Sequence, residues 1–132
     1  NDRIDFRSII TGGDLAISSD KGDDIVFVQD ANVGLSFLSF TDEGLDRITA
    51  TRVTTVEDFT LDAGPQNDIV ALTTVTSDKN VNLNLGDGAD RLTSTSVAAL
   101  FDAIAVGGAG VDTLVNRGFF GGVKTEVIEF ER

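Results

Sequence analysis

The 132-residue chain contains no His, Cys, Trp, Tyr or Met. Without His and Cys it lacks the usual ligands of zinc, haem and iron–sulfur clusters, and neither a Ser–His nor a Cys–His nucleophile can be assembled. No disulfide can form, so the redox compartment stays undetermined. Carboxylates, hydroxyls, backbone carbonyls and a few Arg and Lys remain, a set that suits a hard cation such as Ca²⁺. Because even an initiator Met is missing, we expect a piece excised from a larger protein with neighbouring domains.

Basic residues and long apolar runs are also scarce. Ten Lys and Arg stand against 22 Asp and Glu, a formal net charge of −12. A nucleic-acid-binding domain needs a basic footprint, and an anionic membrane repels an acidic chain, so we expect neither partner. No apolar run is long enough for a transmembrane helix or a signal-peptide core, so we expect no membrane insertion. With 41% hydrophobic residues, the chain can bury the core of one domain.

The sequence does contain a repeat of 22 residues. Its most regular column is an aspartate: Asp2, Asp24, Asp46, Asp68, Asp90 and Asp112. The second residue after each is a branched aliphatic: Ile4, Val26, Ile48, Val70, Leu92 and Leu114. The seventh is apolar: Ile9, Ala31, Val53, Val75, Val97 and Phe119. These columns predict six repeats in a single domain: residues 2–23, 24–45, 46–67, 68–89, 90–111 and 112–132.

Within a repeat, polar and apolar residues alternate. In residues 79–85, KNVNLNL, the Asn side chains face one way and the aliphatic side chains the other, which is typical of a half-buried strand. One such unit cannot bury its own apolar side, whereas stacked units bury it continuously. We therefore predict an all-β fold, a right-handed parallel β-helix (β-solenoid) of six coils. Each coil should contain three strands, namely one after the Asp, one around the seventh residue and one closing the unit.

The residues before the Asp column predict a special turn. Four positions before it stand Asp or Gly: Asp20, Asp42, Gly64, Gly86 and Gly108. Two positions before it stand Gly22, Gly44, Gln66, Gly88 and Gly110. Gly permits left-handed or crowded backbone, and Asp hydrogen-bonds its own turn. We expect Gly44, Gly88 and Gly110 to have positive φ or a close backbone neighbour, and the turn at Gln66 to be rebuilt.

This turn resembles a known calcium-binding motif. Residues 107–115, GGAGVDTLV, fit the G-G-x-G-x-D-x-U-x motif of RTX (repeat-in-toxin) repeats, and residues 85–93, LGDGADRLT, lack only its first Gly. In that family, Ca²⁺ lies between stacked turns, held by Asp carboxylates and turn carbonyls. The resemblance implies a Ca²⁺ site between the last two complete turns, at Asp90, Asp112, Gly86, Gly88, Gly108 and Gly110. Weaker copies of the motif extend the expectation to Asp24, Asp46 and Asp68. RTX coils carry two such turns, but each coil here carries one, so only one edge could hold ions.

Electrostatics gives a separate reason to consider a cation. Stacked coils would place the Asp carboxylates ~5 Å apart. Two like charges at that distance repel by ~3 kcal/mol at an effective dielectric constant of 20. Bound Ca²⁺ would neutralise the column. The alternative is that each Asp only caps its turn through backbone N–H groups, and that Arg3, Arg47 and Arg91, which follow alternate Asp residues, offset part of its charge.

We expect a module without enzymatic activity. Its role would be structural or adhesive, in an extracellular or cell-surface bacterial protein, with end-to-end self-association at the open ends of the solenoid. The alternative is a fragment of a polysaccharide-acting or carbohydrate-binding parallel β-helix. A concave surface with converging carboxylates outside the Asp column would favour that alternative, whereas uniform coils without long loops favour the module.

Overall fold

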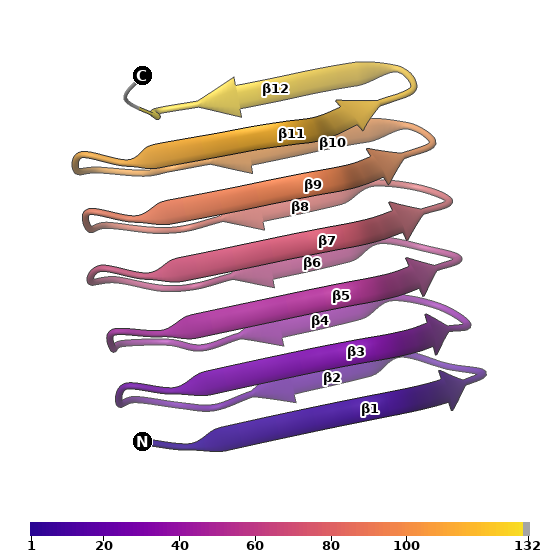
Figure 1. Cartoon of the computed structure of the whole chain (residues 1–132), viewed down its shortest axis with the longest axis horizontal. Helices are drawn as coiled ribbons and strands as arrows, with labels where there is room; N and C mark the ends of the chain where they lie inside the picture. Colours follow the sequence, from indigo (N-terminus) through magenta and orange to yellow (C-terminus); the bar gives the residue numbers. More distant parts are fainter. Residues whose placement is uncertain (131–132) are drawn as a thin grey trace.

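The computed structural model describes residues 1–130, in which all regular secondary structure is β-strand. Each coil contains one long and one short strand, and the two kinds form separate six-stranded parallel sheets (Figure 1). The long strands are β1 (Arg3–Thr11), β3 (Ile25–Val33), β5 (Arg47–Thr55), β7 (Ile69–Ser77), β9 (Arg91–Ala99) and β11 (Thr113–Gly121). The short strands are β2 (Leu15–Ser18), β4 (Phe37–Phe40), β6 (Phe59–Asp62), β8 (Val81–Asn84), β10 (Asp102–Val106) and β12 (Lys124–Ile128). Among these residues there is no helix with the length and apolarity needed to cross a membrane.

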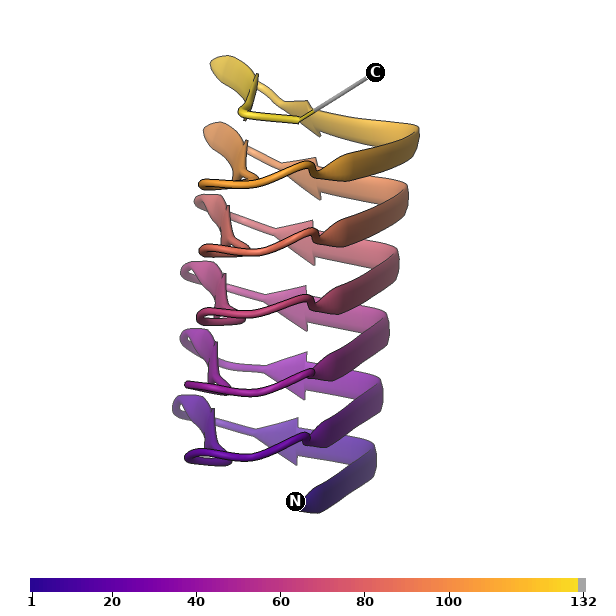
Figure 2. The ribbon, with the colours of Figure 1, turned by 90° about the vertical axis from the view of Figure 1, so that its left-hand side faces the viewer.

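The coils stack with a constant register of 22 residues. For example, Val53 pairs with Val75, and Val75 pairs with Val97. The near strands in Figure 1 run left to right, the far strands return right to left, and the chain rises from its N-terminus, so the winding is right-handed. Figure 2 shows the six turns stacked along one axis. The predicted β-solenoid is therefore confirmed.

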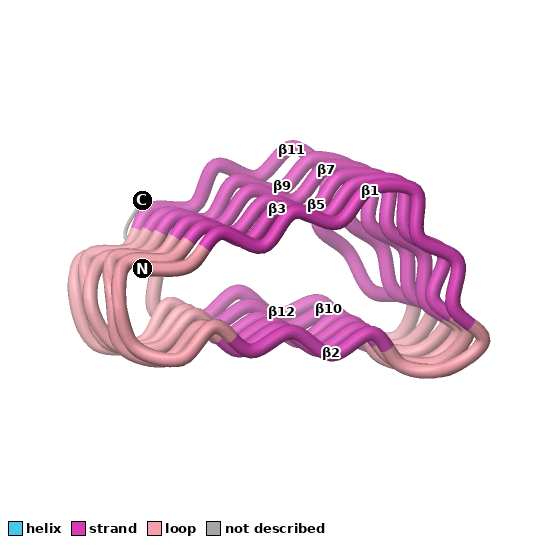
Figure 3. Tube along the Cα trace, turned by 90° about the horizontal axis from the view of Figure 1, so that it is seen from below, coloured by secondary structure: helices cyan, strands magenta, loops and turns pink. Residues whose placement is uncertain are grey.

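The prediction of three strands per coil is wrong. The first two expected strands are one nine-residue strand that bends at its sixth residue, and Figure 3 shows the long sheet arching over the short one. Each bend residue has a left-handed backbone, with φ between 53° and 56° in five coils and 115° in the last: Ser8, Asp30, Arg52, Thr74, Ser96 and Gly118. The bend leaves two consecutive residues facing outward, so in β3 the inward positions step from Val28 to Ala31. This step explains why the second apolar column lies at an odd distance from the Asp.

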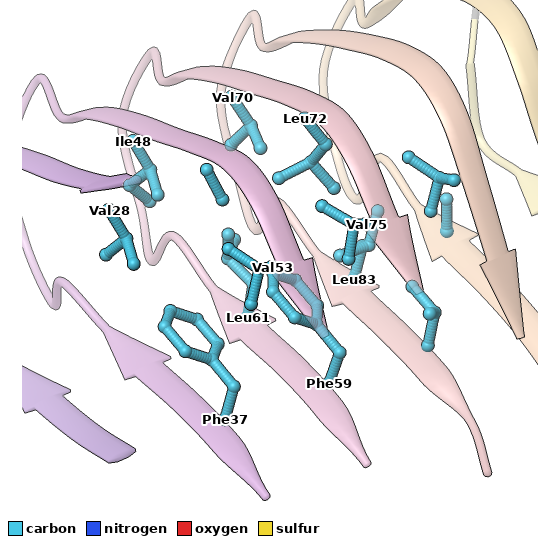
Figure 4. Packing of buried hydrophobic residues seen from close by; sticks show 14 of the residues in the cluster. Val28, Phe37, Ile48, Val53, Phe59, Leu61, Val70, Leu72, Val75 and Leu83 are labelled. Atoms are coloured by element: carbon cyan, nitrogen blue, oxygen red, sulfur yellow. The ribbon is translucent and has the colours of Figure 1, made fainter. Parts of the chain in front are cut away.

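The core consists of columns of stacked apolar side chains between the two sheets (Figure 4). Both aliphatic columns predicted from the sequence are buried in the inner coils, with at most 1% exposure at Ile48, Val53, Val70, Val75, Leu92 and Val97. Their members in the end coils, Ile4, Ile9 and Leu114, are partly buried. The short strands add Leu61, Leu83 and a stacked pair of rings, Phe37 and Phe59, with centroids 4.6 Å apart. Since every coil places similar residues at similar positions, the turns of successive coils are also aligned.

Candidate functional site: an aspartate ladder along one edge

The Asp column lies in the turn that leads from each short strand into the next long strand. Five of its members have side chains taken out of solvent, with residue exposures of 2% or less: Asp24, Asp46, Asp68, Asp90 and Asp112. We call these five residues the aspartate ladder. Asp2 begins the same column in the first coil, where it is exposed.

One oxygen of every ladder carboxylate binds the backbone of the preceding coil. The N–H of Asp46 donates to Oδ1 of Asp68 at 2.7 Å, and the N–H of Asp90 donates to Oδ1 of Asp112 at 2.8 Å. The same bond recurs between the other successive members of the column. The carboxylates thus cap backbone N–H groups, as the alternative to metal binding predicts, but they do so between coils and not within their own turn.

The other carboxylate oxygen is an orphan. Oδ2 of each ladder residue is buried and receives no hydrogen bond from any described residue. Burial, opposed by the bond from the Asp46 N–H and reinforced by the neighbouring carboxylates, raises the pKa of Asp68 to about 8. The same causes raise the pKa of Asp90 to about 6 and that of Asp46 above its ordinary value. A buried anionic oxygen without a partner is costly, so the ladder favours either protonation or a bound cation.

The turn before the ladder follows the backbone conformation expected from its Asp and Gly residues. Position four before the ladder is left-handed in every coil, with φ between 59° and 100° at Asp20, Asp42, Gly64, Gly86 and Gly108. Both residue types tolerate this conformation better than other residues do.

The residue two positions before each ladder Asp lies against the backbone of the preceding coil. A Cβ atom at Gly88 would overlap the carbonyl oxygen of Gln66, and a Cβ at Gly44 would overlap that of Gly22. Gly110 meets Gly88 in the same way and also has a φ of 151°. The expectation of a close backbone neighbour or positive φ at these glycines is confirmed.

The turn at Gln66 is rebuilt in its backbone conformation but keeps the hydrogen bond between coils. The N–H of Gln66 donates to the carbonyl of Asp87 at 2.6 Å, as the N–H of Gly88 donates to that of Ala109 at 2.9 Å. Gln66 makes this bond with a φ of 88°, whereas the φ of Gly44 and of Gly88 in the adjacent coils lies outside the left-handed region. A left-handed backbone costs a non-glycine residue only ~1–2 kcal/mol, which the aligned coils on either side can offset.

The ladder alone does not assemble a metal site. Within residues 1–130, no three Asp, Glu, His or Cys side chains converge closely enough to hold an ion. The structure brings Asp90 and Asp112 together through their shared hydrogen bond, and it places the carbonyls of Gly86 and Gly88 against Gly108 and Gly110 of the next coil. Carboxylate and carbonyl oxygens are the donor types that Ca²⁺ requires. The residues therefore fit Ca²⁺ in chemistry, provided that carbonyls or water complete the shell.

The outer face of the short-strand sheet contains a feature that the sequence did not reveal. A hollow of about 380 Å³ is lined by Phe40, Asp42 and Asp62, among others, and a second hollow of about 220 Å³ adjoins it at Phe40. Phe40 is 44% exposed. An outward aromatic at a strand end was the only sequence signal, and a single exposed Phe is too common to identify a site.

Comparison with protein-family models, with curated proteins and with solved structures gave no match to this chain.

Proposed function

We propose that the chain is a structural, non-catalytic repeat module that acts as a stiff spacer or adhesion segment. The observation that carries this proposal is the uniformity of the coils. Both sheets pair in register from the first coil to the last, and every connection between strands is short. Catalytic sites are usually built on loops that differ from their neighbours, and these coils offer none.

Ca²⁺ bound along the aspartate ladder would stabilise this module. Each ion would contact orphan Oδ2 atoms and turn carbonyls, and would offset the repulsion between stacked carboxylates. The RTX-like motifs at residues 85–93 and 107–115 and the orphan oxygens of Asp90 and Asp112 support this assignment.

An extracellular or bacterial cell-surface location agrees with such a role. Extracellular Ca²⁺ modules bind with dissociation constants of ~10⁻⁴–10⁻³ M, a range in which secretion itself would complete folding. The sequence supports this proposal only through its RTX resemblance and its acidic composition. Neighbouring domains, or further copies stacked end to end, would extend the spacer.

A thermal melt with CaCl₂, with chelator and with MgCl₂ tests the Ca²⁺ assignment. Ca²⁺ at a hundredfold excess over its dissociation constant should stabilise the fold by ~2.7 kcal/mol per site. The double variant Asp90→Asn/Asp112→Asn keeps both Oδ1 acceptors but should lose much of this response. Asp78→Asn, on the opposite edge and exposed, should keep it. A melting temperature that is the same in CaCl₂ and chelator would contradict Ca²⁺ binding.

The hollow at Phe40, Asp42 and Asp62 favours the alternative, a carbohydrate-acting β-helix. If that alternative holds, the chain should release products from a polysaccharide, and Asp42→Asn/Asp62→Asn should abolish the release. The structural proposal expects no release from either protein, so product formation by the wild type would replace it.

A further inference from the structure

Arginine is concentrated on the outer face of the long-strand sheet. The long strands contain six Arg and only two acidic residues, Asp5 and Asp30, so this sheet carries a net charge of +4. The chain as a whole carries −12, so the remainder carries −16. The six are exposed: Arg3, Arg7, Arg47, Arg52, Arg91 and Arg117. One face of a strongly acidic molecule is therefore basic.

Half of these guanidinium groups have no acidic partner. Arg3 and Arg7 contact Asp5 at 3.6 Å and 2.8 Å, and Arg52 contacts Asp30 at 2.5 Å. Arg47, Arg91 and Arg117 form no ion pair with any residue from 1 to 130. These three side chains can bind an anion without first breaking an internal contact.

The unpaired arginines are widely spaced, and threonines lie further along the same strands. Arg47 and Arg91 lie in register on either side of Ile69, which places their backbones two strand spacings apart, or ~9.6 Å. Thr51, Thr73 and Thr95 form a column further along the same strands, and Arg117 continues that column. Two more threonines occupy the outward positions between these rows, Thr49 and Thr93. We call Arg47, Arg91, Arg117 and these five threonines the arginine–threonine face.

The chemistry of this face suits an acidic sugar polymer. Arg binds a carboxylate through two parallel hydrogen bonds, and the threonine hydroxyls can donate to and accept from sugar hydroxyls. Phosphates recur every ~3.4 Å along a nucleic-acid strand, about three times more densely than these guanidinium groups, and the charge on the rest of the chain repels a dense polyanion. A polysaccharide with uronate groups on alternate sugars has a sparser charge pattern.

We propose that the arginine–threonine face binds an extended uronate-containing polysaccharide. The polymer would run along the solenoid axis, with carboxylates on Arg47 and Arg91 and sugar hydroxyls on the threonine columns. The inference goes beyond the structural role proposed above and does not depend on Ca²⁺, because the aspartate ladder lies in the turns and not on this face. The polysaccharide would be the ligand of the adhesion segment.

Binding to hyaluronate tests the proposal. Affinity would be measured by biolayer interferometry at ~0.15 M ionic strength and at the Ca²⁺ concentration that gives the highest melting temperature. The variant Arg47→Gln/Arg91→Gln should bind about tenfold more weakly, since two exposed charge contacts are lost. The control Lys21→Gln/Lys79→Gln makes the same change in net charge away from this face and should bind like the wild type. Arg47→Lys/Arg91→Lys, which keeps the charge but not the paired hydrogen bonds, should fall between them.

Three results would overturn the proposal. The first is no binding of hyaluronate by the wild type, or equal binding of neutral dextran. The second is equal weakening of hyaluronate binding by Arg47→Gln/Arg91→Gln and by the control Lys21→Gln/Lys79→Gln, which would mean that only the net charge of the protein matters. The third is tighter, Arg47- and Arg91-dependent binding of single-stranded DNA. Melting curves of each variant with Ca²⁺ and chelator would be recorded in parallel, because the Ca²⁺ response belongs to the structural proposal and should be unchanged in the Arg variants.

Discussion

The turn at Gly88 has no room for a side chain. Its φ lies outside the left-handed region, so the constraint comes from the preceding coil, where a Cβ would overlap the Gln66 carbonyl and lie 2.9 Å from Oδ1 of Asp90. Gly88→Val should therefore lower the free energy of unfolding by ~1–3 kcal/mol, as overpacking does. Asn82→Val, on the outer face of β8, should change it by no more than ~0.5 kcal/mol. Urea denaturation compares the two, and equal midpoints would mean that the coils separate at this turn without cost.

At the bend residue of β7, we expect a substitution to stabilise the fold. Thr74 has a φ of 54°, which is unfavourable for a β-branched side chain. The equivalent residue of the last coil is Gly118, with a φ of 115°. Thr74→Gly should raise the free energy of unfolding by ~1 kcal/mol, because it relieves more backbone strain than it adds chain entropy. Thr73→Gly, one residue earlier in ordinary strand backbone, should lower it. A loss of stability in both variants would show that the bend is not strained.

At the scale of the strand, the sequence predicted what depends on side-chain type and missed what depends on backbone. The columns at Val53 and Val75, and the crowded glycine at position 88, follow from residue identity at a fixed spacing. The bend did not, because its column contains Ser, Asp, Arg, Thr and Gly, and no one residue type signals a left-handed backbone. The orphan oxygens could not be predicted from the sequence either. The orientation of each carboxylate is set by the coil spacing and by the N–H group that donates a hydrogen bond to its Oδ1.

The aspartate ladder should make stability depend on pH when Ca²⁺ is absent. The pKa of Asp68 is raised from 3.8 to about 8 in the folded protein, so between these values the native state binds more protons than the unfolded state. Stability in chelator should therefore be highest near pH 4 and fall as the pH rises towards 8, by up to ~1.4 kcal/mol per pH unit for one such group.

The variant Asp68→Asn isolates this effect. The amide keeps an oxygen acceptor for the Asp46 N–H, but it cannot ionise, so the decline in stability between pH 4 and pH 8 should become shallower. Asp78→Asn, an exposed residue on the opposite edge, should leave the decline unchanged. The measurement is the urea midpoint at several pH values in chelator. Wild-type stability that rises with pH over this range would mean that the ladder carboxylates are ionised and stabilised in the native state.

For the whole molecule, each coil contacts only the coils next to it. The 22-residue register continues from β1 to β11 in one sheet and from β2 to β12 in the other. The stability of such a stack is close to a sum of coil and interface contributions. The separation of charge into a basic sheet and acidic turns is also a property of the whole stack. Sequence totals could not reveal it, because strand alternation decides which face each Arg occupies.

Removal of one coil tests this additivity. Deletion of residues 49–70 removes one period of 22 residues and joins Ile48 to Ala71. Ala71 pairs with Thr49 in the intact chain, so it takes the place of Thr49 in the strand. Core columns and ladder remain aligned, although the stacked rings of Phe37 and Phe59 are lost. The shortened chain should fold with a parallel-β circular dichroism spectrum and lose about 1–3 kcal/mol, the usual share of 22 residues in domain stability.

Deletion of residues 49–69 is the matched control, one residue shorter. It joins Ile48 directly to Val70, so two inward residues become neighbours near the start of a long strand. A shift of one residue turns a strand's buried side chains to solvent. The turn before Arg47 can absorb the shift only by moving Asp46 out of the aspartate ladder, where its N–H donates to Asp68. We expect this chain to be unfolded or aggregated, as judged by circular dichroism and size-exclusion chromatography. If both deletions fold equally well, strand register is not what holds the coils together. If neither folds, the six coils behave as one indivisible unit and the nearest-neighbour description fails.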